Sequence, residues 1–184
     1  MRTLLKVGKY SATWTKLNLA LRYLGSAMIM IQLRKYQPKD WNAIAIIHDR
    51  ARLDELRASV GVEAFLSLAE TAEDEELFEG EVWVAEDNDL VVGFVAIDSE
   101  MTEITWLYVL PDRYRQGIGR KLLRQAIANC KSTVYVSVLS GNNAALNLYQ
   151  SEGFKIVETK TGKLNGNESF SATGHILQRE CRKS

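Results

Sequence analysis

Residues 105–124 read TWLYVLPDRYRQGIGRKLLR, and the interpretation of the whole chain starts from this stretch. Its apolar run from Trp106 to Leu110 ends at Pro111, and a basic turn then leads into Gly117 and Gly119. A strand that ends in a glycine-containing turn and continues into a helix exposes backbone N–H groups that can bind an anion. The helix is predicted from apolar residues at helical spacing, namely Ile118, Leu122, Leu123, Ala126 and Ile127.

Two common phosphate-binding motifs do not fit this turn. A dinucleotide-binding fingerprint requires a third glycine at the position of Leu122, and no GxxxxGK[ST] sequence precedes the helix. The turn is nevertheless basic, because Asp112 is the only acid between Ile104 and Ser151. This charge favours an extended ligand with several phosphates, and the alternative is a surface helix with incidental charge. The basic residues are Arg113, Arg115, Arg120, Lys121, Arg124 and Lys131.

Charge is unevenly distributed along the chain. Residues 1–27 contain five basic residues and no acid, and removing these five from the 23 basic residues leaves 18 against 23 acids. An acidic domain is a poor candidate for nucleic-acid binding, because contacts to phosphates supply most of that affinity. No apolar run approaches the roughly 20 residues needed to span a bilayer, so no membrane-spanning segment is predicted.

The chain is predicted to form one domain over residues 28–184, preceded by a basic extension over residues 1–27 outside the fold. The alternatives for this extension are a secretory signal or an organellar transit peptide, and its composition matches both weakly. Cys130 and Cys181 have neither CxxC spacing nor clustered histidines, so neither a metal site nor a disulfide is predicted. A reduced cytoplasmic protein is therefore expected.

Hydrophobic periodicity predicts the order of the secondary structure elements. A strand at 31–34 is followed by two helices, one that opens at Pro38 and one around residues 62–68. Three antiparallel strands come next, then the glycine helix, a strand, a helix that Asn142 caps and Gly153 ends, and two last strands. This order predicts an α/β (α+β) fold with a mixed, mostly antiparallel sheet. The later strands are expected at 82–85, 90–97, 102–110, 133–138, 154–157 and 170–177.

Two motifs resemble those of the GNAT superfamily of acyl-CoA-dependent N-acetyltransferases. The first is the Q/R-x-x-G-x-G/A turn after the fourth strand, which reads YRQGIG here, with Tyr114 in the place of Gln or Arg. The resemblance extends over the chain from Ile31 to the last strand. It implies the GNAT fold, with helices on both faces of a sheet of about seven strands and a gap where the fourth and fifth strands splay apart. The second motif, N-x-x-A-x-x-x-Y-x-x-x-G-F, is matched by Asn142, Ala145, Tyr149, Gly153 and Phe154.

The resemblance also implies acetyl-CoA as the cosubstrate and no metal. The pantetheine arm is expected in the gap, paired with main-chain groups of Leu107, Tyr108 and Val109. An N–H group near Val109 is expected to stabilise the oxyanion. Asn142 is expected to help at the cofactor, and the pyrophosphate is expected on the backbone of the turn. The turn residues concerned are Arg115, Gln116, Gly117, Ile118, Gly119 and Arg120.

In enzymes of this family the substrate amine attacks the thioester directly. Tyr149 is the expected acid for the departing thiolate, and the alternative is an ordinary core aromatic. Glu103 is the base candidate, and the alternative is a solvated carboxylate at the strand edge. Strand alternation places Glu103 on the same face as Leu107. His48 is expected at the surface or boundary of the first helix, and neither His48 nor His175 is expected to act as the base.

The predicted function is transfer of an acetyl group from acetyl-CoA to a primary amine of a small molecule, a peptide or a protein. The first alternative is a non-catalytic acyl-CoA-binding sensor or interaction module, and the second is transfer of a longer acyl group. The protein is expected to be a monomer or a homodimer with no nucleic-acid or membrane partner. The identity of the acceptor is not predicted. Its side of the site is built from the first two helices and the last hairpin, and these elements vary with no fixed code.

Overall fold

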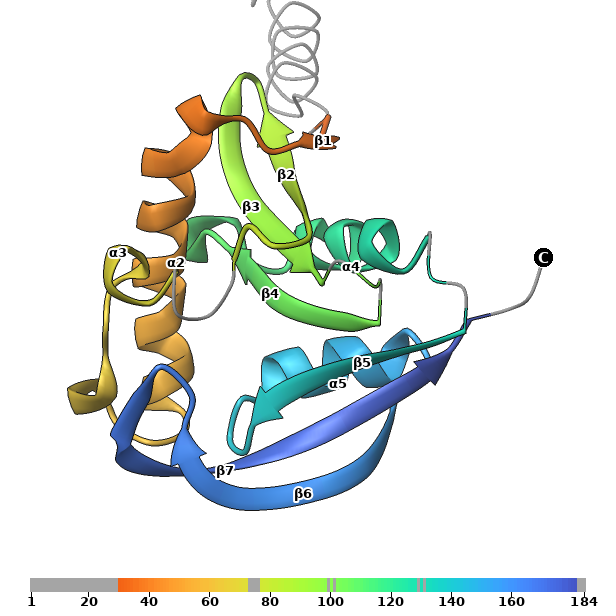
Figure 1. The fold of residues 1–184 in the computed structure, drawn as a ribbon. Coiled ribbons are helices and arrows are strands. Elements are labelled where there is room, and N and C mark those ends of the chain that lie inside the picture. The colour runs from red at the N-terminus through yellow and green to blue at the C-terminus, as the bar shows by residue number, and fades with distance from the viewer. Residues whose placement is uncertain are drawn as a thin grey trace, which may run out of the picture. The chain divides into compact units, whose positions relative to one another are not determined.

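The computed structural model describes residues 30–72, 77–98, 100, 102–128, 130 and 132–181. The extension predicted over residues 1–27 lies outside these described residues. Within the unit formed by residues 31–184, the described residues build one sheet with the strand order β1-β2-β3-β4-β5-β7-β6 (Figure 1). The strands are β1 Gln32–Lys35, β2 Glu81–Asp87, β3 Leu90–Ile97, β4 Glu103–Val109, β5 Thr133–Leu139, β6 Lys155–Leu164 and β7 Asn167–Glu180.

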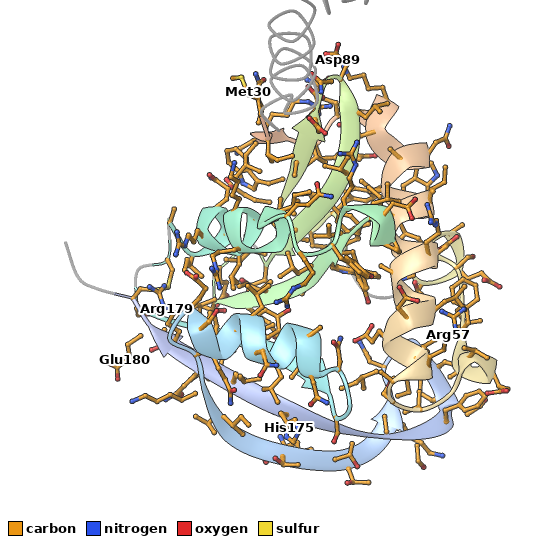
Figure 2. All side chains as sticks on the ribbon, turned by 180° about the vertical axis from the view of Figure 1, so that it is seen from behind. Met30, Arg57, Asp89, His175, Arg179 and Glu180 are labelled. Carbon is orange, nitrogen blue, oxygen red and sulfur yellow. A yellow bond between two sulfur atoms is a disulfide. The ribbon has the colours of Figure 1, made fainter. Side chains whose placement is uncertain are left out.

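Helices cover both faces of the sheet. On one face, Ile47 of α2 and Leu68 of α3 share a buried cluster with Phe94 of β3. On the other face, which lies in front in Figure 2, α4 and α5 bury Leu122 and Tyr149 in a second cluster. Burial of apolar surface on both faces stabilises this layered arrangement and confirms the predicted α/β (α+β) fold. The helices are α2 Trp41–Arg57, α3 Leu68–Thr71, α4 Ile118–Ala128 and α5 Asn143–Ser151.

The parallel strands β4 and β5 pair over only two positions. Glu103 lies opposite Tyr135 and Ile104 lies opposite Val136, and no further pair joins these two strands. β4 stays paired with β3 as far as Val109, so only its β5-facing edge lacks a strand partner among the described residues. We call this unpaired region, from Thr105 onward, the β4–β5 gap. The predicted splay between the fourth and fifth strands is confirmed.

A bulge in the β3–β4 ladder changes which residues share a face of β4. Ile97 pairs with Ile104, whereas the preceding Ala96 pairs with Trp106, so β4 has one extra residue at this point. Ile104 therefore packs on the α4 side, while Trp106 packs on the α2 side. The prediction of uninterrupted alternation along β4 was wrong, because it placed Glu103 with Leu107. Glu103, next to Ile104, instead points to the α2 face.

The second predicted helix is broken into two short pieces. Residues Val62–Ala64 form a single 3₁₀ turn, and α3 begins only at Leu68. Ser67 caps α3, since the Glu70 carboxylate accepts hydrogen bonds from the Ser67 backbone N–H at 2.8 Å and from its hydroxyl at 2.7 Å. This capping box starts a new helix, so the apolar residues at 62–68 do not belong to one continuous helix.

Cys130 and Cys181 form a disulfide, which corrects the prediction of two unpaired, reduced cysteines. The antiparallel pairing of β5 with β7 explains their proximity, because Thr133 lies opposite Glu180. Cys130 stands just before β5 and Cys181 just after β7, with their Cα atoms 6.0 Å apart. The Cys181 N–H also donates to the Ser132 carbonyl at 2.6 Å. The bond therefore connects the segment that follows α4 to the end of the sheet.

Breaking this disulfide is expected to destabilise the protein. The two cysteines are 51 residues apart, and opening a loop of that length lowers the free energy of unfolding by about 4 kcal/mol in the chain-entropy description. Urea denaturation of the oxidised protein, the reduced protein and Cys130→Ser measures the loss. Reductant should leave Cys130→Ser unchanged. Equal midpoints for the oxidised and reduced protein would contradict the stabilising role.

Candidate functional site

The turn before α4 has a backbone shape that points N–H groups outward. Arg115 and Gly117 have positive φ angles of 63° and 78°, and Gln116 between them does not. In a turn whose φ angles change sign from residue to residue, successive backbone N–H groups can form a concave nest that binds an anion. The α4 helix begins directly afterwards at Ile118, and its first N–H groups extend the nest. The turn therefore has a backbone shape compatible with anion binding, and the binding itself stays a prediction.

The positive charge around this turn is smaller than the sequence suggests. Glu152 at the end of α5 accepts ion pairs from Arg120 at 2.9 Å and from Arg124 at 2.8 Å. Arg113 pairs with Asp87 of the β2–β3 hairpin at 3.0 Å. Glu152 falls one residue beyond the stretch over which the acids were counted, so its effect on the two arginines was missed.

Gly119 faces the β4–β5 gap. A Cβ atom placed there would lie 3.3 Å from Cδ2 of Leu148 on α5 and 3.7 Å from Cγ2 of Val109 on β4. A longer side chain would therefore extend between β4 and α5. Glycine at this position keeps the α4 backbone open to a ligand that passes between the two elements.

Tyr149 lies on α5 beside this region and is 5% exposed. Its ring packs against Phe154, with the ring centroids 5.8 Å apart. Burial, and secondarily the negative charge of Glu55, raise the pKa of the Tyr149 hydroxyl above its usual range. The hydroxyl is thus held in its protonated form, which a proton donor at neutral pH requires.

Asn142 caps α5, as predicted. Its side-chain Oδ1 accepts from the Ala145 N–H at 3.2 Å. Its Nδ2 group donates to Oε1 of Glu55 on α2 at 3.4 Å. The amide is therefore held at both ends, and it lies between α5 and α2.

Glu103 lies at the start of β4 and belongs to the two-residue pairing with β5, with Ile104 between it and the gap. Burial, and secondarily the charge of Asp98, raise the pKa of its carboxyl group. Asp98 Oδ1 accepts from the Glu103 N–H at 2.9 Å, which keeps this second carboxylate near. A raised pKa brings a carboxylate closer to the range in which it can act as a base at neutral pH.

Tyr114, the position that departs from the family motif, contacts α2. Burial and the neighbouring Asp54, which also hydrogen-bonds to it, raise the pKa of the Tyr114 hydroxyl to about 12. A second contact joins the same two segments, since Arg50 donates to Asp112 at 3.0 Å. Tyr114 thus helps to fix the turn against α2.

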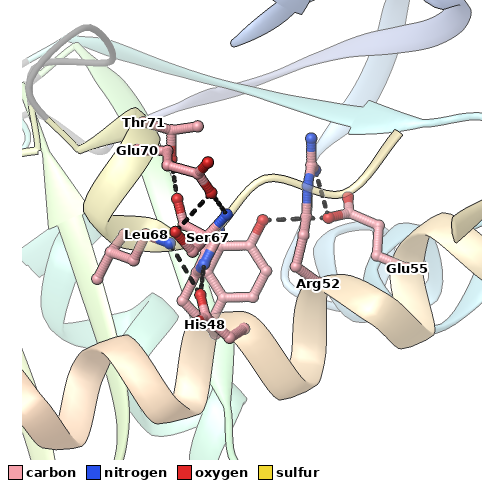
Figure 3. Close-up of polar contacts among 9 residues, drawn as sticks. His48, Arg52, Glu55, Ser67, Leu68, Glu70 and Thr71 are labelled. Atoms are coloured by element: carbon pink, nitrogen blue, oxygen red, sulfur yellow. Dashed lines mark hydrogen bonds and ion pairs between the residues drawn. The ribbon is translucent and has the colours of Figure 1, made fainter. Parts of the chain in front are cut away.

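Glu55 is a site residue that sequence reasoning missed. Its Oε2 accepts from Arg52 at 2.7 Å and from the Tyr108 hydroxyl at 3.1 Å (Figure 3). A signal for it exists in the sequence, because Ile44, Ile47 and Ala51 define the buried stripe of α2 and Glu55 continues it one turn later. A carboxylate on the buried face of a helix needs partners, and its presence there indicates a polar contact inside the fold.

His48 is buried, and its prediction as a surface or boundary residue was wrong. It is 2% exposed, and its ring packs 5.4 Å from Trp106 and 5.0 Å from Tyr108. Burial lowers the pKa of His48, which keeps the imidazole neutral. Its Nδ1 contacts Asp49 at 2.9 Å, and that carboxylate also accepts from the Leu68 N–H (Figure 3).

A small pocket opens on the α2 face of β4. It lies between α2, the segment that includes α3, and the turn that joins β6 to β7. His175, by contrast, lies on the β6–β7 ribbon (Figure 2), where its Nδ1 contacts the Thr159 hydroxyl at 2.9 Å. The pocket is lined by residues that include His48, Arg52, Thr71, Trp106, Tyr108 and Asn167.

Neither a metal cluster nor a membrane helix is found in the part of the chain that the structure describes. No group of three or more His, Cys, Asp or Glu side chains there could hold a metal ion. None of the helices in that part combines the length and apolar character that crossing a bilayer requires.

A splayed pair of parallel strands, an amide nest at the following helix and a second helix that carries a buried tyrosine define the GNAT class of acyltransferase folds. Residues 78–156 of the chain match the family described as the acetyltransferase (GNAT) domain.

Among curated proteins, N-alpha-acetyltransferase 50 of Danio rerio is 32% identical over 106 residues, which are 52% of this chain and 62% of the relative. Peptidyl-lysine N-acetyltransferase YiaC of Escherichia coli (strain K12) is 34% identical over 76 residues, which are 41% of this chain and 51% of the relative. The chain thus spans between half and two thirds of the length of these two relatives.

Solved structures share the fold at low identity. The ribosomal-protein-S18-alanine N-acetyltransferase from Escherichia coli superposes with a TM-score of 0.64 at 20% identity, over 84% of this chain and 96% of that one. A phosphinothricin acetyltransferase from Sinorhizobium meliloti, solved in complex with acetyl-CoA, superposes with a TM-score of 0.63 at 17% identity, over 82% of this chain and 88% of that one.

Proposed function

We propose that this protein transfers an acetyl group from acetyl-CoA to a primary amine by direct attack of the amine on the thioester. One observation carries the proposal: the open backbone at Gly119, the unpaired edge of β4 and the α5 segment with Tyr149 meet at the β4–β5 gap. Leu148, which faces Gly119, is the chain neighbour of Tyr149. The proposed anion site at the start of α4 and the proposed proton donor on α5 therefore lie on neighbouring helices.

The residues at the gap fit acetyl-CoA. The nest at Arg115 to Gly117 and the first N–H groups of α4 would hold the pyrophosphate. The unpaired edge of Leu107, Tyr108 and Val109 would pair with the amide groups of the pantetheine arm, much as an added strand does. Bound in this way, the cosubstrate supplies an activated acetyl thioester.

Three groups of the chain have roles in the transfer. The Val109 N–H would donate to the thioester oxygen as negative charge develops on it. Glu103 would take the proton from the acceptor ammonium, directly or through water, so that a neutral amine forms the new C–N bond. As the C–S bond breaks, the nitrogen would release its remaining extra proton to solvent, and the Tyr149 hydroxyl would give its proton to the thiolate and regain one from solvent.

The names of the relatives guide the choice of acceptor. Two of them are called an N-alpha-acetyltransferase and a peptidyl-lysine N-acetyltransferase. We infer that amines of polypeptides are the first acceptors to test, followed by small amines. Longer acyl donors belong in the same assay.

Radiolabelled acetyl-CoA tests the proposal against pooled peptides with free N-termini, lysine peptides with blocked N-termini, and small amines. Label transferred to one acceptor class supports the proposal and identifies the class. Tight binding of acetyl-CoA without transfer to any pool would instead favour the acyl-CoA sensor. Failure to bind acetyl-CoA would refute both.

The monomeric or homodimeric state and the cytoplasmic location stay predictions. Size-exclusion chromatography with light scattering checks the first, and cell fractionation checks the second. The disulfide bears on location, because such bonds persist mainly in oxidising compartments. Alkylation of free thiols in freshly lysed cells would show whether the bond is present there.

The acidic side of the pH–rate profile tests Glu103. A base must be ionised, so the rate should fall as pH drops through the raised pKa of Glu103. Glu103→Gln should remove this fall and lower the rate by about 100-fold. Asp98→Asn removes the nearby charge and should move the fall to lower pH. An unchanged profile in Glu103→Gln would remove this residue as the base.

A further inference from the structure

Glu55 accepts hydrogen bonds from three different parts of the fold. Arg52 lies one helical turn earlier on α2, Tyr108 lies near the end of β4, and Asn142 lies at the N-terminus of α5. The distances are 2.7, 3.1 and 3.4 Å, and the Glu55 side chain is only 13% exposed. A carboxylate this enclosed is held in place by its donors and in turn holds them.

Two of these partners lie on opposite sides of the β4–β5 gap. Tyr108 comes from the β4 side and Asn142 from the α5 side. In Figure 1, α2 runs across the ends of β4 and β5, and contacts beyond Glu55 agree with this. Arg50 bonds to Asp112 after β4, and the Ala58 carbonyl lies so close to Gly141 after β5 that no Cβ atom fits there. Glu55 therefore connects the two sides of the gap through one side chain.

Glu55 also determines which way the Asn142 amide faces. The Oδ1 atom of Asn142 caps α5 through the Ala145 N–H, and the Nδ2 group is directed to Glu55. An amide without a partner for its NH₂ group could rotate by 180° and lose the cap. With Glu55 present, both the oxygen and the NH₂ group of the amide have a hydrogen-bond partner, so only one orientation satisfies both.

The negative charge of Glu55 also acts on Tyr149, the proposed proton donor. Glu55 is the charged group that acts on Tyr149, and its negative charge, after burial, disfavours the phenolate. The Arg52 guanidinium is bonded to the same carboxylate and offsets part of this charge. Tyr149 packs on Phe154 and the α4-side cluster, whose members are apolar.

We propose that Glu55 is a positioning residue of the transfer site, which orients Asn142 and Tyr108 across the β4–β5 gap. The proposal rests on the proposed function for its kinetic part. Its structural part concerns this chain alone, so it can be tested without any acceptor.

Glu55→Gln keeps the size of the side chain and changes one acceptor oxygen into a donor. That donor must face either Asn142 or the Tyr108 and Arg52 pair, so one side of the gap loses its bond. We expect the dissociation constant of acetyl-CoA, measured by calorimetry, to rise about tenfold, as the loss of one hydrogen bond to a charged group predicts. Circular dichroism and thermal unfolding confirm that the variant is folded.

The alkaline side of the kcat profile separates positioning from simple support of the fold. Without the negative charge, Tyr149 loses its proton at lower pH, so the decline of kcat should begin at lower pH in Glu55→Gln. Glu55→Asp keeps the charge on a shorter side chain and should restore this limb while acetyl-CoA binding stays weakened. Glu158→Gln, on the exposed edge strand β6, is the matched control and should change neither quantity.

A double-mutant cycle tests the link to Asn142. If Glu55 acts through Asn142, then Glu55→Gln, Asn142→Ala and the double variant should each raise the acetyl-CoA dissociation constant by a similar factor. Additive effects together with an unmoved alkaline limb would overturn the proposal while leaving the acetyltransferase function intact. Absence of transfer by the unmodified protein would overturn that function, and the binding cycle would still report on Glu55.

NMR of the Asn142 side chain tests the orienting role without acetyl-CoA. The Asn142 side-chain NH₂ signals, assigned in ¹⁵N NMR by their loss in Asn142→Ala, should shift and exchange faster with solvent in Glu55→Gln. Unchanged signals would refute the orienting role even if the protein bound no acetyl-CoA.

Discussion

Gly119→Glu is expected to abolish detectable binding of acetyl-CoA. The new Cβ atom would lie 3.3 Å from Leu148 and 3.7 Å from Val109, so the rest of the side chain must extend into the space between α5 and β4. This is the space that the proposal assigns to the pantetheine arm. The added carboxylate would also repel the pyrophosphate held at the adjacent turn. Calorimetry should show a dissociation constant raised by more than about 100-fold.

Gly162→Glu provides the control. Gly162 lies in β6, where a Cβ atom would have no neighbour within 4 Å, so the same substitution there adds the same charge in open space. Binding by this variant should equal that of the unmodified protein. If Gly119→Glu were folded and still bound acetyl-CoA with unchanged affinity, the ligand would have to bind elsewhere, and the assignment of the gap would be refuted.

The order of elements could be predicted from the sequence because each carries a strong local signal. The Asn142 cap, the glycine turn before α4 and the strand patterns all depend on neighbours within a few positions. The pairing of the two cysteines does not. It follows from the register of β5 on β7, which places Thr133 opposite Glu180. Once that register is known, a contact between Cys130 and Cys181 is the expected result.

The departures at the site also come from contacts between distant segments. The bulge in β4 moves Glu103 to the α2 face. A bulge residue is recognised only by its missing partner on the neighbouring strand, so the alternation within β4 alone could not predict it. Glu152 offsets part of the charge of Arg120 and Arg124 only because α5 lies beside α4. Glu55 was missed because its partners, Tyr108 and Asn142, are 53 and 87 residues away along the chain.

Tyr149→Phe is expected to lower kcat by about 100-fold or more while acetyl-CoA affinity changes little. The substitution removes one hydroxyl and keeps the ring that packs against Phe154. A thiolate that leaves without a proton is less stable than the thiol, so the loss should fall on the step in which the C–S bond breaks. Single-turnover measurements with saturating acetyl-CoA, together with calorimetry, separate this step from binding.

The same reasoning predicts the pH dependence of acetyl transfer by the unmodified protein. Because burial and Glu55 raise the pKa of Tyr149, the hydroxyl keeps its proton through the neutral range, and kcat should fall only when strongly alkaline pH removes it. Tyr149→Phe should lack this alkaline fall. Tyr135→Phe, on an exposed position of β5, removes an equivalent hydroxyl outside the gap and should behave as the unmodified protein does. Equal turnover in Tyr149→Phe and Tyr135→Phe would show that Tyr149 is a packing residue, and the thiolate would then take its proton from water.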